Sequence, residues 1–350
     1  MNKKKSEGEI GMRREPGLDL LRSLGLLAVV SFHFFLYNGF YYQVQKGLSM
    51  YLANCALTLS ISCNGVFLML TGYLKCEKKP SAAYYRGVIP LLFSYVLAAV
   101  ANLAFRTFYL GEALTVRNWI FGLLDCSGAH YGWYVEMYLG LFLLAPVMNL
   151  ALSQLHTCRQ FLWLIGTMVL VALLPSDSAH LPDFWVSLYP LAYYCVGAAI
   201  RKFRPVLRTV WCLVGVAALA ALIGGVTYLT ANGGTYRDGY NPVWGSLCIL
   251  VQTTLLFLAF YRLRFPRILC KLFRSVAAVS FESYLLSYLF DQIVYRLLPH
   301  LRRPGCYSLA YCTMALPIFL LSCLAGSLLY GIRRLVFRRA ARRSSEQVSV

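Results

Sequence analysis

Charged residues are scarce in this chain of 350 residues: Asp, Glu, Lys and Arg make up 13% of it, and apolar residues make up 59%. In a typical soluble domain, charged residues alone account for about a quarter. The apolar runs follow one another with short connections, which excludes an inserted soluble domain. The N-terminal segment also lacks a small-residue cleavage site after its first apolar run, so we expect that helix to be retained.

Acidic residues are the fewest, with 14 Asp and Glu against 33 Lys and Arg and a formal net charge of +19. Such a charge would indicate nucleic-acid binding if the basic residues formed a patch on a soluble fold. Here they lie between apolar runs, where they indicate membrane topology and contact with anionic lipid headgroups. We therefore expect a lipid bilayer as partner, and no nucleic acid.

The 12 cysteines are spread over the whole chain. They form neither a disulfide framework nor a cluster with metal-ligand spacing, so we expect no metal site. Most of them fit the role of small core residues. Cys126 and Cys306 are the only two that we place near the outer face, where a bridge between them is an alternative.

At about 20 apolar residues per crossing, the sequence predicts an all-α, polytopic membrane protein with about ten transmembrane helices. We divide the chain into a basic cytoplasmic tail at 1–17, a transmembrane domain at 18–332 and a second basic cytoplasmic tail at 333–350. The predicted spans are 18–41, 52–74, 87–108, 131–150, 160–176, 184–200, 209–230, 243–261, 275–298 and 307–332.

The basic residues predict the orientation. If the N-terminus is cytoplasmic, most of the 33 Lys and Arg fall on that side, with clusters at 75–86, 201–208 and 262–274. The positive-inside rule then places both termini in the cytoplasm. We expect a multi-pass protein of the plasma membrane of a bacterial cell.

The first apolar run, Leu18 to Tyr42, is interrupted by Arg22 and His33. Their spacing of about three turns places them within about 20° of one helix face and about 16 Å apart along the axis. Ionisable groups inside a span usually face a protein interior or a water-filled cavity, so both are candidate site residues. Alternatively, Arg22 extends to the interface and His33 is an ordinary interior histidine.

Two carboxylates within predicted spans, Glu136 and Asp291, come near the depth of His33. Either of them could fix one tautomer of the imidazole and raise its basicity. The alternatives are structural: Glu136 lies in an interfacial aromatic belt, and Asp291 pairs with Arg296. A third carboxylate, Glu282, comes closer to the depth of Arg22.

The end of the second span combines small residues with polar ones. Gly65 and Gly72 share one helix face, where small residues allow another helix to approach closely. Thr71 and Tyr73 could face a ligand at the cytoplasmic end. A basic cluster follows and could receive the phosphates of a cytosolic donor, or could be a topology signal alone: Lys75, Lys78, Lys79 and Arg86.

The Arg22/His33 pair, preceded by Leu18-Asp19-Leu20-Leu21, resembles the opening motif of the acyltransferase-3 family of integral-membrane acyltransferases. Weaker likenesses extend over most of the chain. They lie in Gly65-Val66-Phe67 with Thr71-Gly72-Tyr73-Leu74, in Arg86-Gly87-Val88-Ile89-Pro90, in the block from His130 to Leu141, and in Ser280-Phe281-Glu282-Ser283-Tyr284-Leu285. Many family members place a His just after this late motif, where this chain has Ser287.

This resemblance implies transfer of an acyl group, usually acetyl from acetyl-CoA, to a hydroxyl of a cell-surface or lipid-linked sugar. Arg22 would hold a donor phosphate or polarise the thioester carbonyl. His33 would act as general base or carry the acyl group itself, supported by Glu136 as a further catalytic residue. We expect the substrates to contact Trp133, Tyr134, Asp291, Tyr73 and Arg86.

A secondary transporter or polysaccharide exporter is the alternative function, with Arg22, Glu282 and Asp291 binding substrate or relaying protons. Transporters often contain inverted repeats and helices broken near the midplane. This sequence has no convincing internal repeat and few prolines at span centres, which favours the acyltransferase. The acceptor stays open among peptidoglycan, capsule, teichoic polymer, lipid-linked sugar and small molecules.

Overall fold

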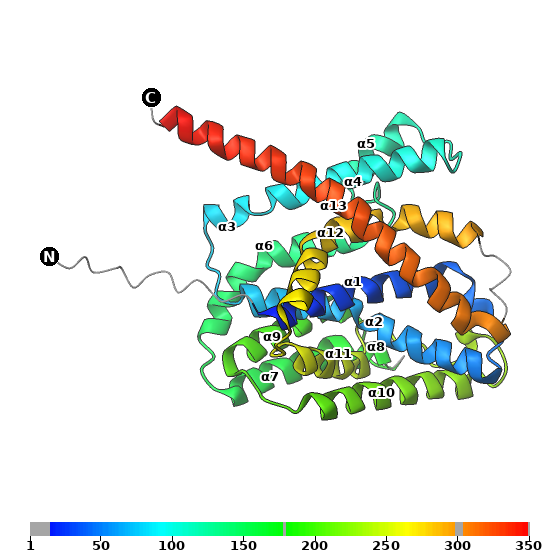
Figure 1. Cartoon of the computed structure of the whole chain (residues 1–350). Coiled ribbons are helices and arrows are strands. Elements are labelled where there is room, and N and C mark those ends of the chain that lie inside the picture. Colours follow the sequence, from blue (N-terminus) through cyan, green and yellow to red (C-terminus); the bar gives the residue numbers. More distant parts are fainter. Residues whose placement is uncertain (1–14, 178–179, 298–303, 349–350) are drawn as a thin grey trace.

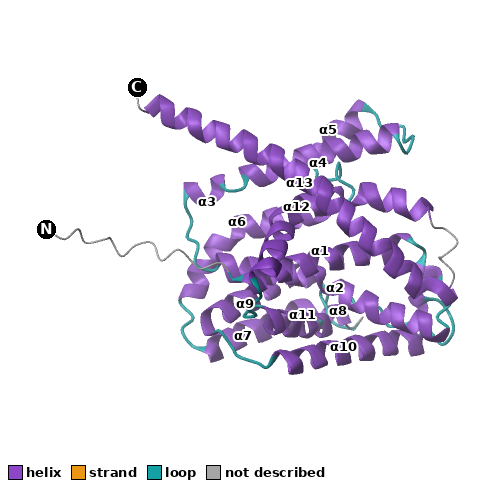
Figure 2. Ribbon diagram, viewed as in Figure 1, coloured by secondary structure: helices purple, strands orange, loops and turns teal. Residues whose placement is uncertain are grey.

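The computed structural model describes residues 15–177, 180–297 and 304–348. Helices make up 80% of it and no β-strand occurs in these ranges, which confirms the all-α class (Figure 2). The α-helices are α1 (Pro16–Tyr37), α2 (Gly47–Lys75), α3 (Ala82–Arg86), α4 (Ile89–Phe108), α5 (Val116–Leu124), α6 (Trp133–Ser153), α7 (Cys158–Met168), α8 (Leu174–Asp177), α9 (Tyr189–Phe203), α10 (Thr209–Thr230), α11 (Leu247–Phe260), α12 (Arg267–Leu297) and α13 (Tyr307–Val348).

Seven helical segments of the described chain are long and apolar enough to cross a membrane. They are Pro16–Tyr37, Gly47–Lys75, Ala82–Phe108, Trp133–Ser153, Cys158–Asp177, Thr209–Thr230 and Tyr307–Arg338. The multi-pass character is thus confirmed, whereas the count of about ten stays a prediction, as does the cytoplasmic side of the termini.

The other three predicted spans fall on α9, α11 and α12. Two of these helices are short, since α9 has 15 residues and α11 has 14. A membrane crossing needs about 20. The third, α12, has 31 residues, but charged side chains, among them Glu282 and Asp291, interrupt its apolar stretch.

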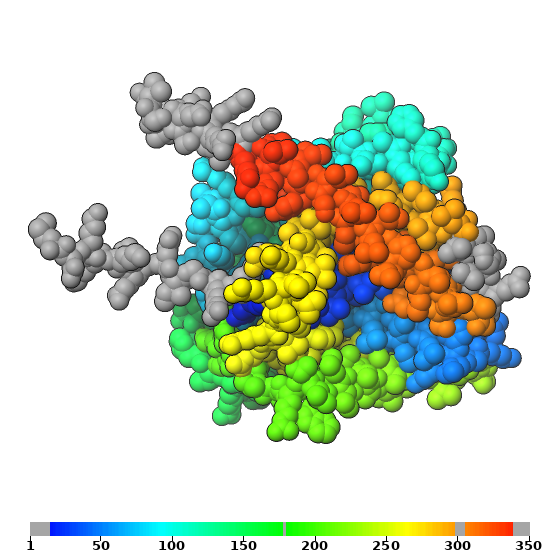
Figure 3. Space-filling view, viewed as in Figure 1, coloured from blue at the N-terminus to red at the C-terminus, as the bar shows by residue number. Residues whose placement is uncertain are grey.

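Helix α1 runs through the middle of the bundle, in contact with α2, α11, α12 and α13 (Figure 1). The space-filling view shows α12 and α13, in yellow to red, lying across part of α1 (Figure 3). Pro16 occupies the first helical turn of α1, where the absence of a backbone N–H costs nothing. A Cβ on Gly17 would lie 2.0 Å from the Phe260 carbonyl oxygen, so this glycine lets α1 begin directly against α11.

Helices α2 and α9 cross at small residues on both sides. A Cβ on Gly72 would lie 2.1 Å from the Tyr194 carbonyl oxygen, and a Cβ on Gly197 would lie 2.1 Å from the Met69 carbonyl oxygen. A Cβ on Gly65 would likewise lie 2.4 Å from the Tyr193 ring. The close helix approach predicted from Gly65 and Gly72 is confirmed, and α9 is the helix that approaches.

The last helix, α13, differs from the prediction in length. It continues without a break past residue 332, where we expected the membrane domain to end, as far as Val348. Arg333 therefore belongs to a packed helix, and its side chain is only 21% exposed.

Replacing Gly72 by alanine tests the crossing of α2 and α9. Because the new methyl group would meet the backbone of α9, we expect Gly72→Ala to lower the free energy of unfolding by about 1–3 kcal/mol. The melting temperature in detergent micelles measures this loss.

Gly140→Ala is the matched control, because a Cβ on Gly140, in α6, would meet nothing within 4 Å. It should keep or slightly raise the melting temperature, since alanine favours a helix over glycine by about 1 kcal/mol. Equal melting temperatures for the two variants would argue against a tight crossing.

Candidate active site

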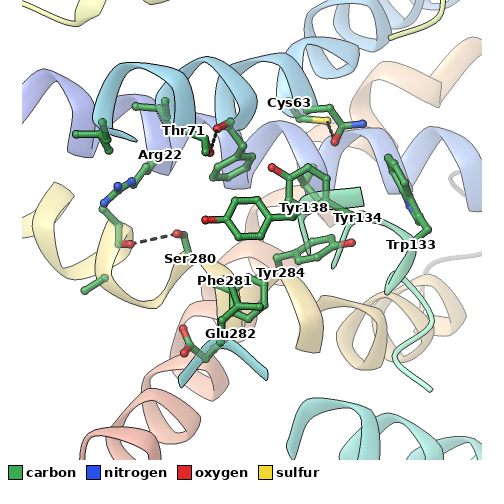
Figure 4. Close-up of a pocket in the computed structure, with 18 of the residues that line it drawn as sticks. Arg22, Cys63, Thr71, Trp133, Tyr134, Tyr138, Ser280, Phe281, Glu282 and Tyr284 are labelled. Carbon is green, nitrogen blue, oxygen red and sulfur yellow. Dashed lines mark hydrogen bonds between the residues drawn. The ribbon is translucent and has the colours of Figure 1, made fainter. Parts of the chain in front are cut away.

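A cavity of about 270 Å³, hereafter the central cavity, lies among α1, α2, α6, α12 and α13. Arg22, Thr71 and Lys75 line it toward one end of the bundle. His33 and Trp133 line it toward the other end. Figure 4 shows Arg22 and Trp133 at opposite ends of this space, with tyrosine rings between them. The structure thus brings Arg22 and His33 to one cavity, as their helical spacing predicted.

His33 is buried and lies against an aromatic ring. Its imidazole stacks on Tyr131, with ring centroids 3.5 Å apart and an interplanar angle of 26°. The Tyr131 hydroxyl donates to Oδ2 of Asp291 at 2.5 Å. Nδ1 of His33 lies 4.0 Å from the same carboxylate oxygen, and it has no hydrogen-bond partner among the described residues. Asp291 therefore faces both the imidazole and the phenol.

Tyr131 is a site residue that sequence reasoning missed. It lies in the turn before α6, and the Tyr284 hydroxyl of α12 donates to its backbone carbonyl. The ring is buried between His33 and the carboxylate of Asp291. Its position in an aromatic block gave no signal beyond that of an interfacial belt, so only the packing of the turn before α6 against α12 reveals it.

Of the two carboxylates predicted near the depth of His33, the structure places Asp291 beside the imidazole and Glu136 outside the central cavity. Glu136 is exposed and does not line the central cavity. The reason is helical geometry: Tyr134 lines the cavity, and a residue two positions further on points about 200° around the helix. Asp291 is fully buried, and its partners Tyr131 and His33 replace the alternative pairing with Arg296.

The Arg22 end of the central cavity holds a second cation, Lys75. The Lys75 ammonium lies 4.2 Å from the ring centroid of Phe142, 5.5 Å from that of Tyr84 and 5.6 Å from that of Tyr138. The face of an aromatic ring attracts a cation and holds it in position, but the ring carries no net charge and so does not neutralise the cation. This end therefore presents positive charge to any group that enters.

An ion pair closes the cavity wall at Glu282. Its Oε1 lies 2.7 Å from Nη1 of Arg333 and accepts a hydrogen bond from Ser94 at 2.8 Å. These three residues come from α12, α13 and α4, so the pair ties three helices together. Sequence reasoning missed Arg333, because we assigned it to the C-terminal tail. Its place one residue after a long apolar run is the signal that could have shown it.

A family model described as an acyltransferase domain matches residues 15–331, nearly the whole chain. This chain belongs to the acyltransferase-3 family. The matched range contains α1, which carries Arg22 and His33, and the α12 carboxylates. No curated protein and no solved structure matches the chain.

Of the five predicted substrate residues of this acyltransferase, two line the central cavity and three, Asp291 among them, do not. Trp133 and Tyr134 line the central cavity. Tyr73 instead turns away, and its hydroxyl donates to Oε2 of Glu15 at 2.7 Å. It follows Thr71 by two positions, so it lies on the other side of α2. Arg86 is exposed at the end of the short helix α3 and does not line the cavity.

Beyond Lys75, the acyltransferase has a second cavity of about 400 Å³, hereafter the basic cavity. Asn149 of α6 holds the intervening turn, because its amide donates to the carbonyls of Lys75 at 2.7 Å and Lys78 at 2.8 Å. Sequence reasoning found two of the four cations in this wall and missed the two from α9. The four are Lys78, Lys79, Arg201 and Lys202.

A second histidine, His130, lies beside Tyr131 in the turn before α6. Its ring stacks on Tyr288, with centroids 4.2 Å apart, and its Nε2 lies 3.3 Å from the Tyr37 hydroxyl. Burial, together with the charge of Arg106, lowers the pKa of His130 below its ordinary value. This shift favours the neutral ring, but His130 does not line the central cavity.

Ser287 occupies the place where many family members have a histidine. Its hydroxyl donates to the Tyr284 carbonyl, and the residue is fully buried. Within the described ranges, no group of three or more His, Cys, Asp or Glu side chains could hold a metal ion. All 12 cysteines are free thiols, so Cys126 and Cys306 do not form the bridge that we considered.

We expect the Glu282–Arg333 pair to stabilise the acyltransferase because each partner is poorly hydrated. Arg333→Gln leaves a buried carboxylate without its cation and should cost about 3–5 kcal/mol of folding free energy. The double variant Glu282→Gln/Arg333→Gln should lose less, because no buried charge remains. Thermal unfolding in detergent measures both.

The control for this pair is Glu77→Gln, which breaks a contact with Arg201 of 3.4 Å in which Glu77 is 72% exposed. An exposed pair contributes at most about 1 kcal/mol. Equal losses for Glu77→Gln and Arg333→Gln would contradict the structural role of the buried pair.

Proposed function

We propose that this acyltransferase moves an acetyl group from cytosolic acetyl-CoA to a hydroxyl of a cell-surface or lipid-linked sugar. The observation that carries the proposal is that Arg22 and His33 line one cavity, toward opposite ends. A thioester made in the cytosol can enter from the Arg22 end, and a sugar hydroxyl from the His33 end. The family supports acyl transfer, and no observation favours the transporter alternative.

The donor end of the proposed enzyme is basic. Arg22 and Lys75 line the central cavity, and the basic cavity begins at the next turn of the chain. Coenzyme A carries three phosphate groups on its nucleotide, and cationic side chains bind phosphate through charge-assisted hydrogen bonds. We place the nucleotide at the basic cavity and the pantetheine arm along the central cavity, past Arg22, so that the thioester reaches His33.

At the acceptor end, His33 is the general base. The Asp291 carboxylate near Nδ1 favours a proton on that nitrogen, which leaves the lone pair of Nε2 for the acceptor hydroxyl. The hydroxyl oxygen attacks the thioester carbonyl as His33 takes its proton. The carbon–sulfur bond breaks, the imidazole returns the proton to the thiolate, and the products are the sugar ester and free coenzyme A.

A second route uses the same geometry, with His33 carrying the acyl group between donor and acceptor. The two routes differ in one observable. When radiolabelled acetyl-CoA is mixed with enzyme in the absence of acceptor, label remains on the protein only if an acyl-histidine forms.

His33→Ala should remain in the membrane at normal level and lose acetyl transfer. Asp291→Asn should lower kcat by about 10²-fold or more, because it weakens the orientation and basicity of the imidazole. Transfer from radiolabelled acetyl-CoA to surface glycans measures both effects. Mass spectrometry of glycans from cells that carry His33→Ala should show the loss of one acetyl increment and identify its carrier.

Glu136→Gln is the control, because Glu136 is an exposed carboxylate outside the cavity. It should keep the acetyl transfer of the unmodified enzyme. Near-normal transfer by His33→Ala would remove this residue from the chemistry.

The basic cavity predicts that the enzyme distinguishes acyl donors by their phosphate groups. The double variant Lys78→Gln/Lys79→Gln should raise KM for acetyl-CoA about tenfold, which corresponds to ~1.4 kcal/mol. It should leave KM for S-acetyl-N-acetylcysteamine unchanged, since this thioester has no phosphate. Lys46→Gln, an exposed lysine next to the start of α2, serves as control. An equal rise for both donors would place the phosphates elsewhere.

A further inference from the structure

A third cavity, of about 310 Å³, lies beside the His33 end of the molecule. The loop between α10 and α11 forms one wall, and Phe32 of α1, Tyr41 of the connection that follows and Ile61 of α2 form the other. We call it the aromatic groove. Its aromatic and polar lining residues are Phe32, Tyr41, Tyr236, Arg237, Asn241 and Trp244, and the rest of its lining is aliphatic.

The aromatic groove and the central cavity meet at two rings that line both, Phe32 and Trp244. Their centroids are 5.3 Å apart. Phe32 also lies 6.2 Å from His33, and Trp244 stacks on Trp133 at 4.8 Å. The aromatic groove therefore ends one ring away from the imidazole.

The loop that forms the groove is fixed to the connection between α1 and α2. Val44 and Thr235 form an antiparallel bridge, and Gln45 N–H donates to the Gly234 carbonyl at 2.8 Å. Nη2 of Arg237 donates to the Tyr42 hydroxyl at 2.9 Å, with its guanidinium 4.6 Å above that ring. These contacts order the wall in advance of any ligand.

The lining combines aromatic faces with a few planar polar groups, as in sites that orient a ligand by a small number of hydrogen bonds. The Trp244 indole N–H is buried and has no acceptor in the described part of the chain. The amide of Asn241 and the guanidinium of Arg237 are exposed. The Arg237 guanidinium donates to the Tyr42 hydroxyl, and the Asn241 amide donates to the Gly239 carbonyl. A lipid tail would leave the indole N–H unpaired and cover these polar groups, whereas the hydroxyls of a sugar form hydrogen bonds with such groups and its apolar face stacks on the rings.

We propose that the aromatic groove is a second sugar subsite, which holds the neighbouring unit of a glycan chain while the reactive unit reaches His33. This inference rests on the proposed acetyl transfer to sugars and adds the substrate class. The acceptor is an oligosaccharide or longer chain, because a single sugar fills only the space at His33.

The test compares acceptors of different length. Surface glycan of the producing cells is chemically deacetylated, cleaved and fractionated into single units and oligomers. With saturating acetyl-CoA, kcat/KM should be about tenfold higher for oligomers, since the second unit adds binding without a second association step.

Arg237→Ala and Asn241→Ala are exposed substitutions that each remove one groove contact. Both should bring the ratio of oligomer to single-unit kcat/KM close to one, with no change in KM for acetyl-CoA. Arg117→Ala is the matched control, because Arg117 is also exposed and lies 5.3 Å above a ring, that of Phe121. It should keep the full ratio.

The experiment distinguishes failure of the subsite from failure of the proposed function. If the unmodified enzyme acetylates both fractions with equal kcat/KM, or if Arg237→Ala and Asn241→Ala keep the full preference, the subsite is overturned and acetyl transfer stands. If neither fraction is acetylated, the proposed function fails and the subsite fails with it.

Discussion

The low polarity of a membrane interior is the constraint that shapes this molecule. An unpaired charge or polar group there is costly, so each ionisable side chain must find a partner or a wet cavity. Helix α1 meets this constraint by turning Arg22 and His33 toward one cavity and its apolar residues toward α2, α12 and α13. The position of α1 in the middle of the bundle follows from this division of its faces.

Helix α12 supplies the matching carboxylates. Glu282 and Asp291 are separated by about two and a half turns, so they point to different neighbours. Asp291 faces α1 through His33, while Glu282 faces α4 and α13 through Ser94 and Arg333. Helix α12 thus places Asp291 beside the imidazole and Glu282 in the cavity wall. Tyr284 and Tyr288 lie between these two carboxylates along the helix.

The sequence predicted features that depend on a single helix. The common face of Arg22 and His33 follows from helical periodicity, and the close approach at Gly65 and Gly72 follows from side-chain size. Both are visible in the structure. Span depth ranked Glu136 and Asp291 alike, because depth carries no information about which face of a helix turns inward.

Features that depend on contacts between two or more segments could not be predicted from the sequence. Arg333 enters the cavity wall because α13 continues past the apolar run, and Tyr131 reaches Asp291 because the turn before α6 packs on α12. The loop between α10 and α11 packs on the connection between α1 and α2 through contacts such as that of Arg237 with Tyr42. The pattern of apolar and polar residues within one segment does not specify which residue of another segment it contacts.

The stacked indoles of Trp133 and Trp244 have one more consequence. They lie face to face at the junction of the central cavity and the aromatic groove. Indole emission depends on the polarity around the ring and on neighbouring aromatic groups. A ligand that binds at this junction would change both the polarity around the indoles and their aromatic contacts. Tryptophan fluorescence would therefore report when one ligand occupies the central cavity and the aromatic groove together.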